Sequence, residues 1–426
     1  MLTIWGERQL FCDGLTRRNF LKIGAFGAGL TLAEMLHLRA LAGTTSASRN
    51  KAAIMVYLPG GPSHMDMWDM KPDAPKEFRG EFNPIKTNVP GIEICEHMPL
   101  QAKMFDKLAV IRSIVSVDEH SDSLVMTGWS ERDNRIAQHP SFGAVVSKVR
   151  GRSSDTACPP FVSLRGMTRG TEPGFLGVAH RPFTPSGPGL NNLRLNRDIS
   201  LERLENRKVL LAKLDQTRRD LDASGTMEGL DSFTARAFEI VTSGTVHQAL
   251  DLSKEDPKVR ERYKGIESFL TARRLVEAGA GCVTLSYGGW DTHGQNFTTL
   301  KRQLPVLDRG IANLVQDLHD RGLADDVVVI VWGEFGRTPK VNGNAGRDHW
   351  APVMSALVAG GGLKMGQAIG ASTSRGERPK DRPYTTQNVL STLYHVLGID
   401  PAMTFLNTAG RPMHILDNRE PVKELL

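Results

Sequence analysis

The sequence has few cysteines, and they lack the spacing of a metal-binding or redox motif. The 426 residues include four cysteines. No two of them form the C-x-x-C arrangement of a zinc ribbon or a thioredoxin-like site. Cys12 lies in the N-terminal segment, which leaves Cys95, Cys158 and Cys282 in the body. An oxidising compartment would allow one disulfide, but cysteine is commonly buried as a free thiol, and we expect that state here.

Long apolar runs and strong charge are also lacking. After the first fifty residues there is no uncharged apolar run of about 18 residues, the length that a membrane-spanning helix needs. The formal net charge is only +6, and part of it lies in the N-terminal segment. Nucleic-acid binding is therefore not indicated, although a basic pocket for an anionic substrate would leave the same composition. The sequence has no internal repeats or low-complexity tracts, and its length suits one large α/β domain with insertions, or two domains.

Residues 1–45 are predicted to be an export signal rather than part of the fold. Residues 16–22 contain a pair of arginines followed by Phe-Leu-Lys, and a mildly apolar run rich in small residues follows at 23–32. This pattern resembles a twin-arginine signal; the alternative is an amphipathic helix with an incidental arginine pair. We therefore expect recognition by the twin-arginine translocase and a periplasmic or extracellular location, with residues 46–426 forming the domain.

Apolar runs typical of buried strands alternate with helical patterns through the body. Strands are predicted at residues 51–58, 108–115, 161–164, 282–287, 326–332 and 353–358, and helices at 143–149, 259–278, 298–321 and 386–397. Continuous apolar runs indicate strands buried on both faces, as in parallel sheets. The alternation indicates an α/β fold with a largely parallel sheet. Residues 165–280 are predicted to be an insertion, rich in glycine, proline and asparagine at first and helical afterwards.

Acidic and histidine residues follow four of these strands. In open α/β sheets, ligands gather at the carboxyl ends of the strands. One such cluster is usually a turn or surface feature, so the prediction depends on the combination of five. Histidine and carboxylate together suit zinc, manganese or iron; we expect divalent metal ions, zinc before manganese, iron or calcium. The candidate metal ligands are His64, Asp66, His120, Asp291, His293, Glu334, Asp348 and His349.

Four segments together resemble a known family. Residues 58–72, 288–293, 334–339 and 346–350 are similar to the bacterial domain-of-unknown-function family 1501. That family carries twin-arginine signals and is grouped with the alkaline phosphatase/sulfatase superfamily. The resemblance implies an alkaline phosphatase-like three-layer sandwich, with a largely parallel central sheet and helices on both faces. It also implies an exported, metal-dependent hydrolase of phosphate or sulfate esters.

The resemblance assigns roles to several candidate residues. Alkaline phosphatase-like enzymes present, in chain order, an aspartate after the first strand, a hydroxyl nucleophile, an Asp…His pair, an acidic element and a late histidine. Asp66, Asp291 with His293, Glu334 and His349 match the metal-binding elements of this series. The pair departs from the usual Asp-x-x-x-His spacing, because only one residue separates its members here, and this leaves ligation by both open.

The sequence does not fix the nucleophile. A formylglycine sulfatase is disfavoured because the C/S-x-P-x-R motif is absent. Ser121, Ser123 and Thr127 are the catalytic candidates, since a hydroxyl at a helix N-terminus beside a metal would be stabilised as an alkoxide. Alternatively, His120 is a further metal ligand, and water activated by the metal attacks the ester directly.

Arg337 is a further catalytic candidate, predicted to orient the phosphate or sulfate by paired hydrogen bonds. The alternative is that it packs on a nearby phenylalanine or bonds a backbone turn. The predicted substrate is a small-molecule or polysaccharide ester. The alternative function is that of a catalytically lapsed member of the same fold that binds metal or glycan.

Overall fold

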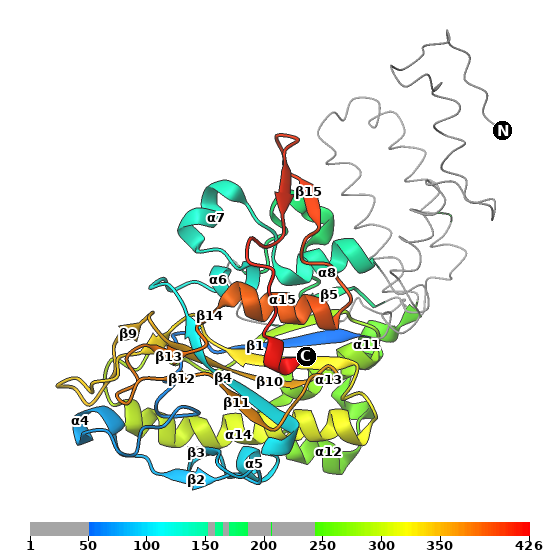
Figure 1. Ribbon diagram of the computed structural model, residues 1–426. Coiled ribbons are helices and arrows are strands. Elements are labelled where there is room, and N and C mark those ends of the chain that lie inside the picture. The colour runs from blue at the N-terminus through cyan, green and yellow to red at the C-terminus, as the bar shows by residue number, and fades with distance from the viewer. Residues whose placement is uncertain (1–50, 152–157, 165–169, 186–205, 207–242) are drawn as a thin grey trace, which may run out of the picture. The chain divides into compact units, whose positions relative to one another are not determined.

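An eight-stranded mixed sheet is the centre of the structure (Figure 1). The computed structural model describes residues 51–151, 158–164, 170–185, 206 and 243–426. The predicted export signal lies outside these residues, and so does much of the predicted insertion, so both stay predictions. The strands of the sheet are β1 (Ala52–Tyr57), β4 (Leu108–Val115), β5 (Phe161–Ser163), β6 (Cys282–Ser286), β7 (Val327–Trp332), β10 (Met354–Gly360), β11 (Gln367–Ile369) and β14 (Tyr384–Thr385).

The strand order is β11-β4-β10-β7-β1-β6-β5, with β14 paired to β4. β1 runs parallel to β6 and β7, and β5 runs parallel to β6. β10 is antiparallel to both of its neighbours, β7 and β4. The predicted α/β fold with a largely parallel sheet is confirmed, and β10 is the reversed strand within it.

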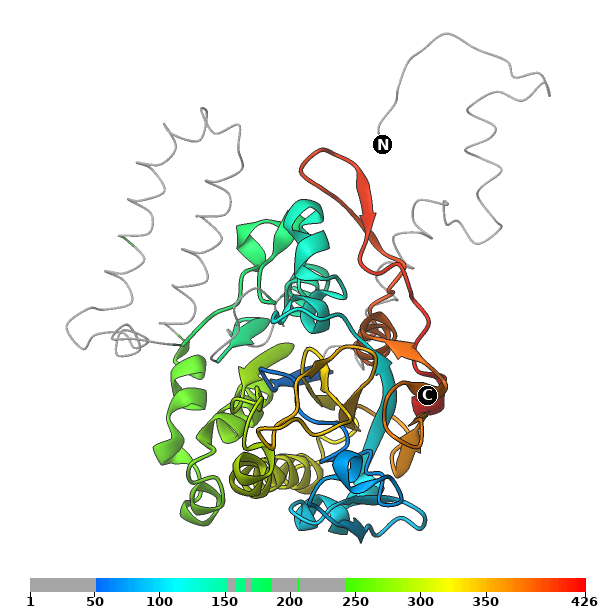
Figure 2. The same ribbon diagram turned by 90° about the vertical axis from the view of Figure 1, so that its left-hand side faces the viewer.

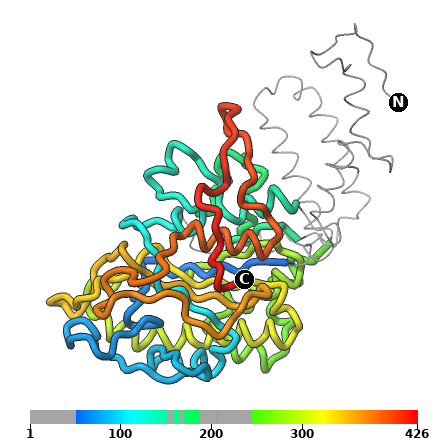
Figure 3. The backbone as a smooth tube through the Cα atoms, viewed as in Figure 1, coloured from blue at the N-terminus to red at the C-terminus, as the bar shows by residue number. Residues whose placement is uncertain are grey.

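Helices cover both faces of this sheet because its strands are apolar on both sides. Along β1, Ile54 and Val56 pack into a core that includes side chains of α13 and α14. The alternate residue Met55 packs into a second core with side chains of α8 and α15. Figure 1 shows α13 and α14 below the sheet and α8 and α15 above it, and Figure 3 traces the chain between these layers. The α-helices are α4 (Lys76–Arg79), α5 (Pro99–Lys103), α6 (Ser123–Thr127), α7 (Glu131–Ala137), α8 (Phe142–Arg150), α11 (Thr245–Leu250), α12 (Pro257–Arg262), α13 (Glu267–Glu277), α14 (Asn296–Asp320) and α15 (Thr386–Val396).

Four two-stranded sheets and several short turns of 3-10 helix complete the described part. The small sheets pair β2 (Pro84–Lys86) with β3 (Glu93–Cys95), β8 (Gly336–Arg337) with β9 (His349–Trp350), β12 (Ala371–Ser372) with β13 (Pro379–Asp381), and β15 (Thr404–Leu406) with β16 (Pro412–His414). The 3-10 turns are Phe105–Lys107, Gly174–Leu176, Val178–His180, Leu252–Lys254 and Lys423–Leu425.

Two sequence-based expectations about this framework have different outcomes. Cys95, Cys158 and Cys282 are buried free thiols, as expected. The single helix predicted at 259–278 is wrong: α12 ends at Arg262 and α13 begins at Glu267. Gly265 lies between them with a φ of +80°, a conformation that glycine adopts without a steric penalty and that ends an α-helix. In the described residues, no helix combines the length and apolar composition needed to cross a bilayer.

Asp308 on α14 holds the start of α5 and makes stability depend on pH. Its carboxylate accepts hydrogen bonds from the backbone N–H groups of Leu100 at 2.8 Å and Gln101 at 2.9 Å. Burial raises the pKa of Asp308 to about 6, although these two bonds act to lower it. The ordinary aspartate pKa is about 3.9, so the folded state holds the proton more tightly. Protonated Asp308 therefore stabilises the folded state fully at pH values below the pKa that Asp308 has in the unfolded chain. This stabilisation is lost as the pH rises through about 6.

The Asp308→Asn variant, which cannot ionise there, should show the effect directly. The free energy of unfolding of the variant minus that of the original protein is expected to rise by roughly 2–3 kcal/mol from pH 4 to pH 7, because only the original protein loses this stabilisation. Urea denaturation of both proteins at a series of pH values measures this difference. A difference that stays constant over that range would contradict the assignment.

Candidate metal centre

The candidate site lies at one end of the sheet, where several strands meet. β1, β4, β6 and β7 share one direction, so their carboxyl ends lie at the same edge. β10 runs the other way, so the segment that precedes it, including β9, reaches this edge as well. Figure 2 faces this end of the molecule, which is at the left in Figure 1. The segments after β4, after β6 and between β7 and β10 supply the histidines and carboxylates of the cluster described below.

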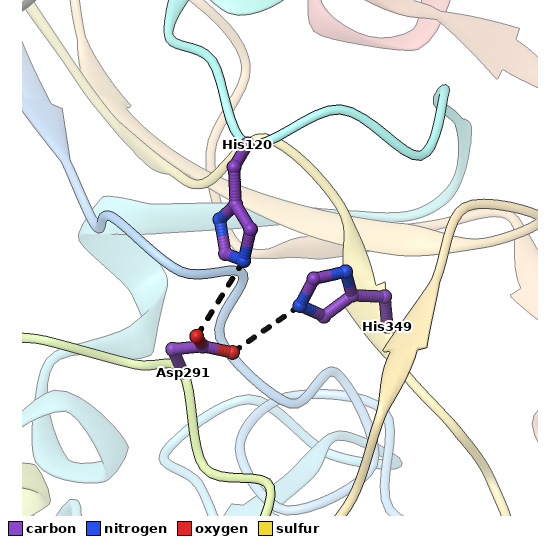
Figure 4. Close-up of side chains that lie close together, drawn as sticks. All are labelled: His120, Asp291 and His349. Atoms are coloured by element: carbon purple, nitrogen blue, oxygen red, sulfur yellow. Dashed lines mark hydrogen bonds and ion pairs between the residues drawn. The ribbon is translucent and has the colours of Figure 1, made fainter.

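Asp291, in the loop after β6, is the centre of the cluster, and the Nε2 atoms of three histidines face its carboxylate. Nε2 of His293 lies 2.9 Å and Nε2 of His349 3.3 Å from Oδ1 of Asp291. Nε2 of His120 lies 3.5 Å from Oδ2. Figure 4 shows His120, from the loop after β4, and His349, from β9, directed at Asp291. The side chains of His120, Asp291 and His293 are about half exposed, so the cluster is open to solvent and to a substrate.

Each of these histidines has a carboxylate behind its other ring nitrogen. Nδ1 of His293 lies 2.6 Å from Oδ1 of Asp348, and Nδ1 of His349 lies 3.1 Å from Oδ1 of Asp118. Nδ1 of His120 lies 3.3 Å from Oε1 of Glu334. An ionised carboxylate only accepts hydrogen bonds, so this placement favours the tautomer that carries its proton on Nδ1, in which Nε2 presents a lone pair.

This pattern suits a cation at the cluster. The Nε2 atoms of His293 and His349 lie 3.1 Å apart, and both face Oδ1 of Asp291. In the tautomer with the proton on Nδ1 these atoms would repel one another, and a cation bound between them would remove the repulsion. Histidines whose Nδ1 bonds a carboxylate are the usual arrangement at metal sites, where the carboxylate fixes the ring and its tautomer. One ligand atom each from His120, Asp291 and His349 can be chosen within 4.8 Å of one another. The donor set of imidazole and carboxylate fits zinc.

Two consecutive glycines after β1 allow this loop to pack against Glu334 and Phe335, which follow β7. The N–H groups of Gly60 and Gly61 bond the Glu334 carboxylate at 2.8 and 3.2 Å. Both have positive φ values, +95° and +71°, and a Cβ on Gly61 would lie 2.3 Å from the Phe335 ring. Any larger residue would push the loop away. Glu334 is 2% exposed, and burial raises the pKa of its carboxyl, although bonds from Gly60, Tyr57 and His120 act to lower it.

Arg337 contacts the cluster from the protein interior, on the buried side of Asp291. It is fully buried, and its guanidinium donates to the carbonyls of Gly60, Gly61 and Arg347 and, at 2.5 Å, to Oδ1 of Asp291. Burial acts to raise the pKa of Asp291, but the hydrogen bond and charge of Arg337 outweigh it, so this pKa lies below its usual range. With its guanidinium buried and engaged by these acceptors, the placement of Arg337 does not support the predicted role of orienting a phosphate or sulfate.

Asp66 and His64 also lie apart from the cluster. The Asp66 carboxylate pairs with the Arg347 guanidinium, at 2.7 Å from Nε and 2.9 Å from Nη2, and both side chains are fully buried. Ser63 and Asn296 donate to the same carboxylate. His64 is buried, and its Nε2 lies 2.9 Å from the Gly376 carbonyl. The structure therefore does not bring these two predicted ligands to the cluster: the Asp66 carboxylate pairs with a buried cation, and His64 bonds a backbone carbonyl.

The three candidate hydroxyls have hydrogen-bond partners in or next to α6. Ser123 Oγ donates to the Trp129 carbonyl at 3.0 Å, and Thr127 Oγ1 donates to the Ser123 carbonyl at 2.8 Å. Ser121 Oγ accepts from the Ser123 N–H. All three residues are almost fully buried. In the described part of the chain, none of them bonds a residue of the cluster, so their placement does not support a nucleophilic role.

The comparison with protein families decides what kind of chain this is. Residues 50–426 match the family described as "Protein of unknown function (DUF1501)". The chain belongs to this family. The match covers the sheet and all of the cluster, and it confirms the resemblance carried by the four sequence segments. No curated protein matches the sequence.

This DUF1501 member also has distant similarity to solved structures. A sulfatase from Pseudoalteromonas sp. has a TM-score of 0.34 and 10% identity, covering 86% of this chain and 72% of the sulfatase. A phosphonate monoester hydrolase from Silicibacter pomeroyi has a TM-score of 0.34 and 11% identity, covering 83% and 74%. A lipoteichoic acid synthase from Listeria monocytogenes has a TM-score of 0.31 and 11% identity, covering 83% and 73%.

The cluster of this DUF1501 member includes three residues that were not among the sequence candidates. Asp118 lies behind His349, and the Asn342 amide bonds both oxygens of Asp348 at 3.2 Å. The Tyr57 hydroxyl bonds Glu334. Asp118 stands in the same polar segment as His120 and could have been found there. Tyr57 ends a buried strand and Asn342 lies in a glycine-rich loop, where neither carries a recognisable signal.

Proposed function

We propose that this protein is an exported, metal-dependent hydrolase of phosphate or sulfate esters, with zinc as the metal. The observation that carries the proposal is the shared arrangement of three histidines, each with Nδ1 on a carboxylate and Nε2 toward Asp291. His120, His293, His349 and Asp291 would hold the ion. When bound, such an ion polarises an ester oxygen and makes water a better nucleophile at neutral pH.

The residues of the chain have separate tasks in this proposal. Asp348, Asp118 and Glu334 hold the three imidazoles in the tautomer that presents Nε2. Hydrogen bonds from His293 and Asn342 keep the pKa of Asp348 below its usual range, so this carboxylate stays ionised and continues to accept the Nδ1 proton. Arg337 offsets part of the negative charge of Asp291 from the buried side, which leaves the exposed side for the ion and the ester.

Water is the proposed nucleophile, because the hydroxyls of Ser123 and Thr127 donate to backbone carbonyls and Ser121 Oγ accepts from a backbone N–H, all away from the cluster. Water adds to phosphorus or sulfur, the bond to the alcohol oxygen breaks, and the alcohol leaves with a proton. Exposure of the histidines leaves room for both water and ester. Export through a twin-arginine signal is part of the proposal and is supported by residues 16–22 of the sequence.

Metal content and ester hydrolysis, measured on the purified full chain, test this function together. Elemental analysis is expected to find zinc bound to the protein, and a panel of aryl phosphates and aryl sulfates should include at least one substrate. A chelator is expected to abolish that hydrolysis, and added zinc to restore it. A protein that binds no divalent metal and hydrolyses no ester would refute the proposal. Tight zinc binding without any hydrolysis would instead favour the catalytically lapsed, metal-binding alternative.

A further inference from the structure

An open hollow of about 450 Å³ is lined by two segments that lead to residues of the metal cluster. Val115 and Ser116, at the end of β4, precede Asp118 and His120. Ala351 also lines the hollow and comes two residues after His349, so the Cα atoms of these two residues lie within about 7 Å of each other. The backbone N–H of Ser116 bonds the Ala351 carbonyl at 3.0 Å. The same two segments therefore build both the cluster and the hollow.

The lining of this hollow is mostly apolar and rigid. Three prolines, Pro352, Pro379 and Pro383, contribute to it together with Val115 and Ala351. Proline has no backbone N–H and a fixed φ, so these walls offer few hydrogen bonds and little freedom to adapt. A hydrated sugar would lose its hydrogen bonds to water without replacement here. The mostly apolar lining suits a small organic group better than a sugar.

One cation stands at the edge of this apolar surface. Arg378 is the charged residue in the lining, it is exposed, and among the described residues its side chain has no acidic partner. It precedes β13, and the turn between β12 and β13 is attached to the site by a 2.7 Å bond from Trp350 Nε1 to the Glu377 carbonyl. Figure 1 shows β12 and β13 next to β9. An arginine at the rim of an apolar hollow matches an anionic group such as a carboxylate.

We propose that the hollow binds the alcohol part of the ester, and that this part is a compact apolar group, such as an aromatic ring, with its own carboxylate paired to Arg378. The proposal rests on the proposed function, since the occupant is the organic half of the same substrate. It makes the substrate a small amphipathic ester with two anionic groups and not a polysaccharide.

Binding of the alcohol product tests this without depending on hydrolysis. 4-Hydroxybenzoate, phenol and glucose serve as probes, with calorimetry on the purified full chain. 4-Hydroxybenzoate is expected to bind about tenfold more tightly than phenol, the effect of one charge-assisted hydrogen bond. The Arg378→Ala variant should lose this tenfold preference and bind phenol as before. Arg375→Ala is the matched control, because Arg375 is exposed on the same turn but lies over the Phe78 ring outside the hollow.

The outcomes separate this inference from the proposed function. Equal binding of phenol and 4-hydroxybenzoate, an unchanged preference in Arg378→Ala, or tighter binding of glucose would overturn the inference, even if the protein hydrolyses aryl esters with zinc. Conversely, the expected preference in a protein that holds no metal would retain the hollow as a carboxylate-binding site and remove the hydrolase.

Discussion

Asp291→Asn is expected to abolish both zinc retention and ester hydrolysis. Asp291 faces the Nε2 atoms of three histidines. In the proposed site its negative charge attracts the cation that these nitrogens also bind. Asparagine has nearly the same shape and keeps an oxygen that can accept from Arg337, so the fold should persist. We expect zinc affinity to fall by more than the roughly 100-fold that loss of an outer carboxylate can cause. Zinc titration with a competing chelator measures the affinity.

Two further aspartate variants calibrate this result. Asp118→Asn alters the carboxylate behind His349 and should weaken zinc binding by about 10–100-fold, with part of the hydrolysis retained. Asp73→Asn changes an exposed aspartate away from the cluster and should change neither quantity. If Asp291→Asn bound zinc as well as Asp73→Asn does, the metal would lie elsewhere and Asp291 would not be a ligand.

Asp66→Ala is expected to cause the largest loss of stability among these variants. Asp66 and Arg347 are both 0% exposed and share two hydrogen bonds. Removing the carboxylate leaves the Arg347 cation buried without its counter-charge, which costs about 3–5 kcal/mol of unfolding free energy. Denaturant titration of the variant against the original protein measures the loss. At the same time, the fraction that remains folded should still bind zinc, because Asp66 does not belong to the cluster.

The paired substitution of both residues provides the control. In the double variant Asp66→Leu with Arg347→Met, no buried charge is left alone, so the loss should be clearly smaller than in Asp66→Ala. If Asp66→Ala were as stable as the original protein but no longer bound zinc, the result would favour the role of metal ligand that the sequence suggested for Asp66. Asp66 would then be a ligand and its pairing with Arg347 incidental to stability.

The framework could be predicted from the sequence because its signals are local. Continuous apolar runs placed β4 and β7 within a residue or two of their observed bounds, and Asp291 and His293 follow their strand directly. The different positions of Asp66 and Asp118 could not be predicted. Both are acidic residues after a strand, and the difference is that Asp66 meets a buried arginine 281 positions away. The placement of Arg337 could not be predicted for the same reason, since its partner Gly61 lies 276 positions away.

The reversed direction of β10 has a consequence for a chain that is still being synthesised. His349 reaches the cluster because β10 starts at the edge where the parallel strands finish, and its partner Asp118 lies 231 positions earlier. A nascent chain that has grown only to the end of β6 offers His120 as the sole histidine of the three. Zinc capture would therefore mark the near-completion of translation, and a truncated product would be recognisable by its inability to hold the metal.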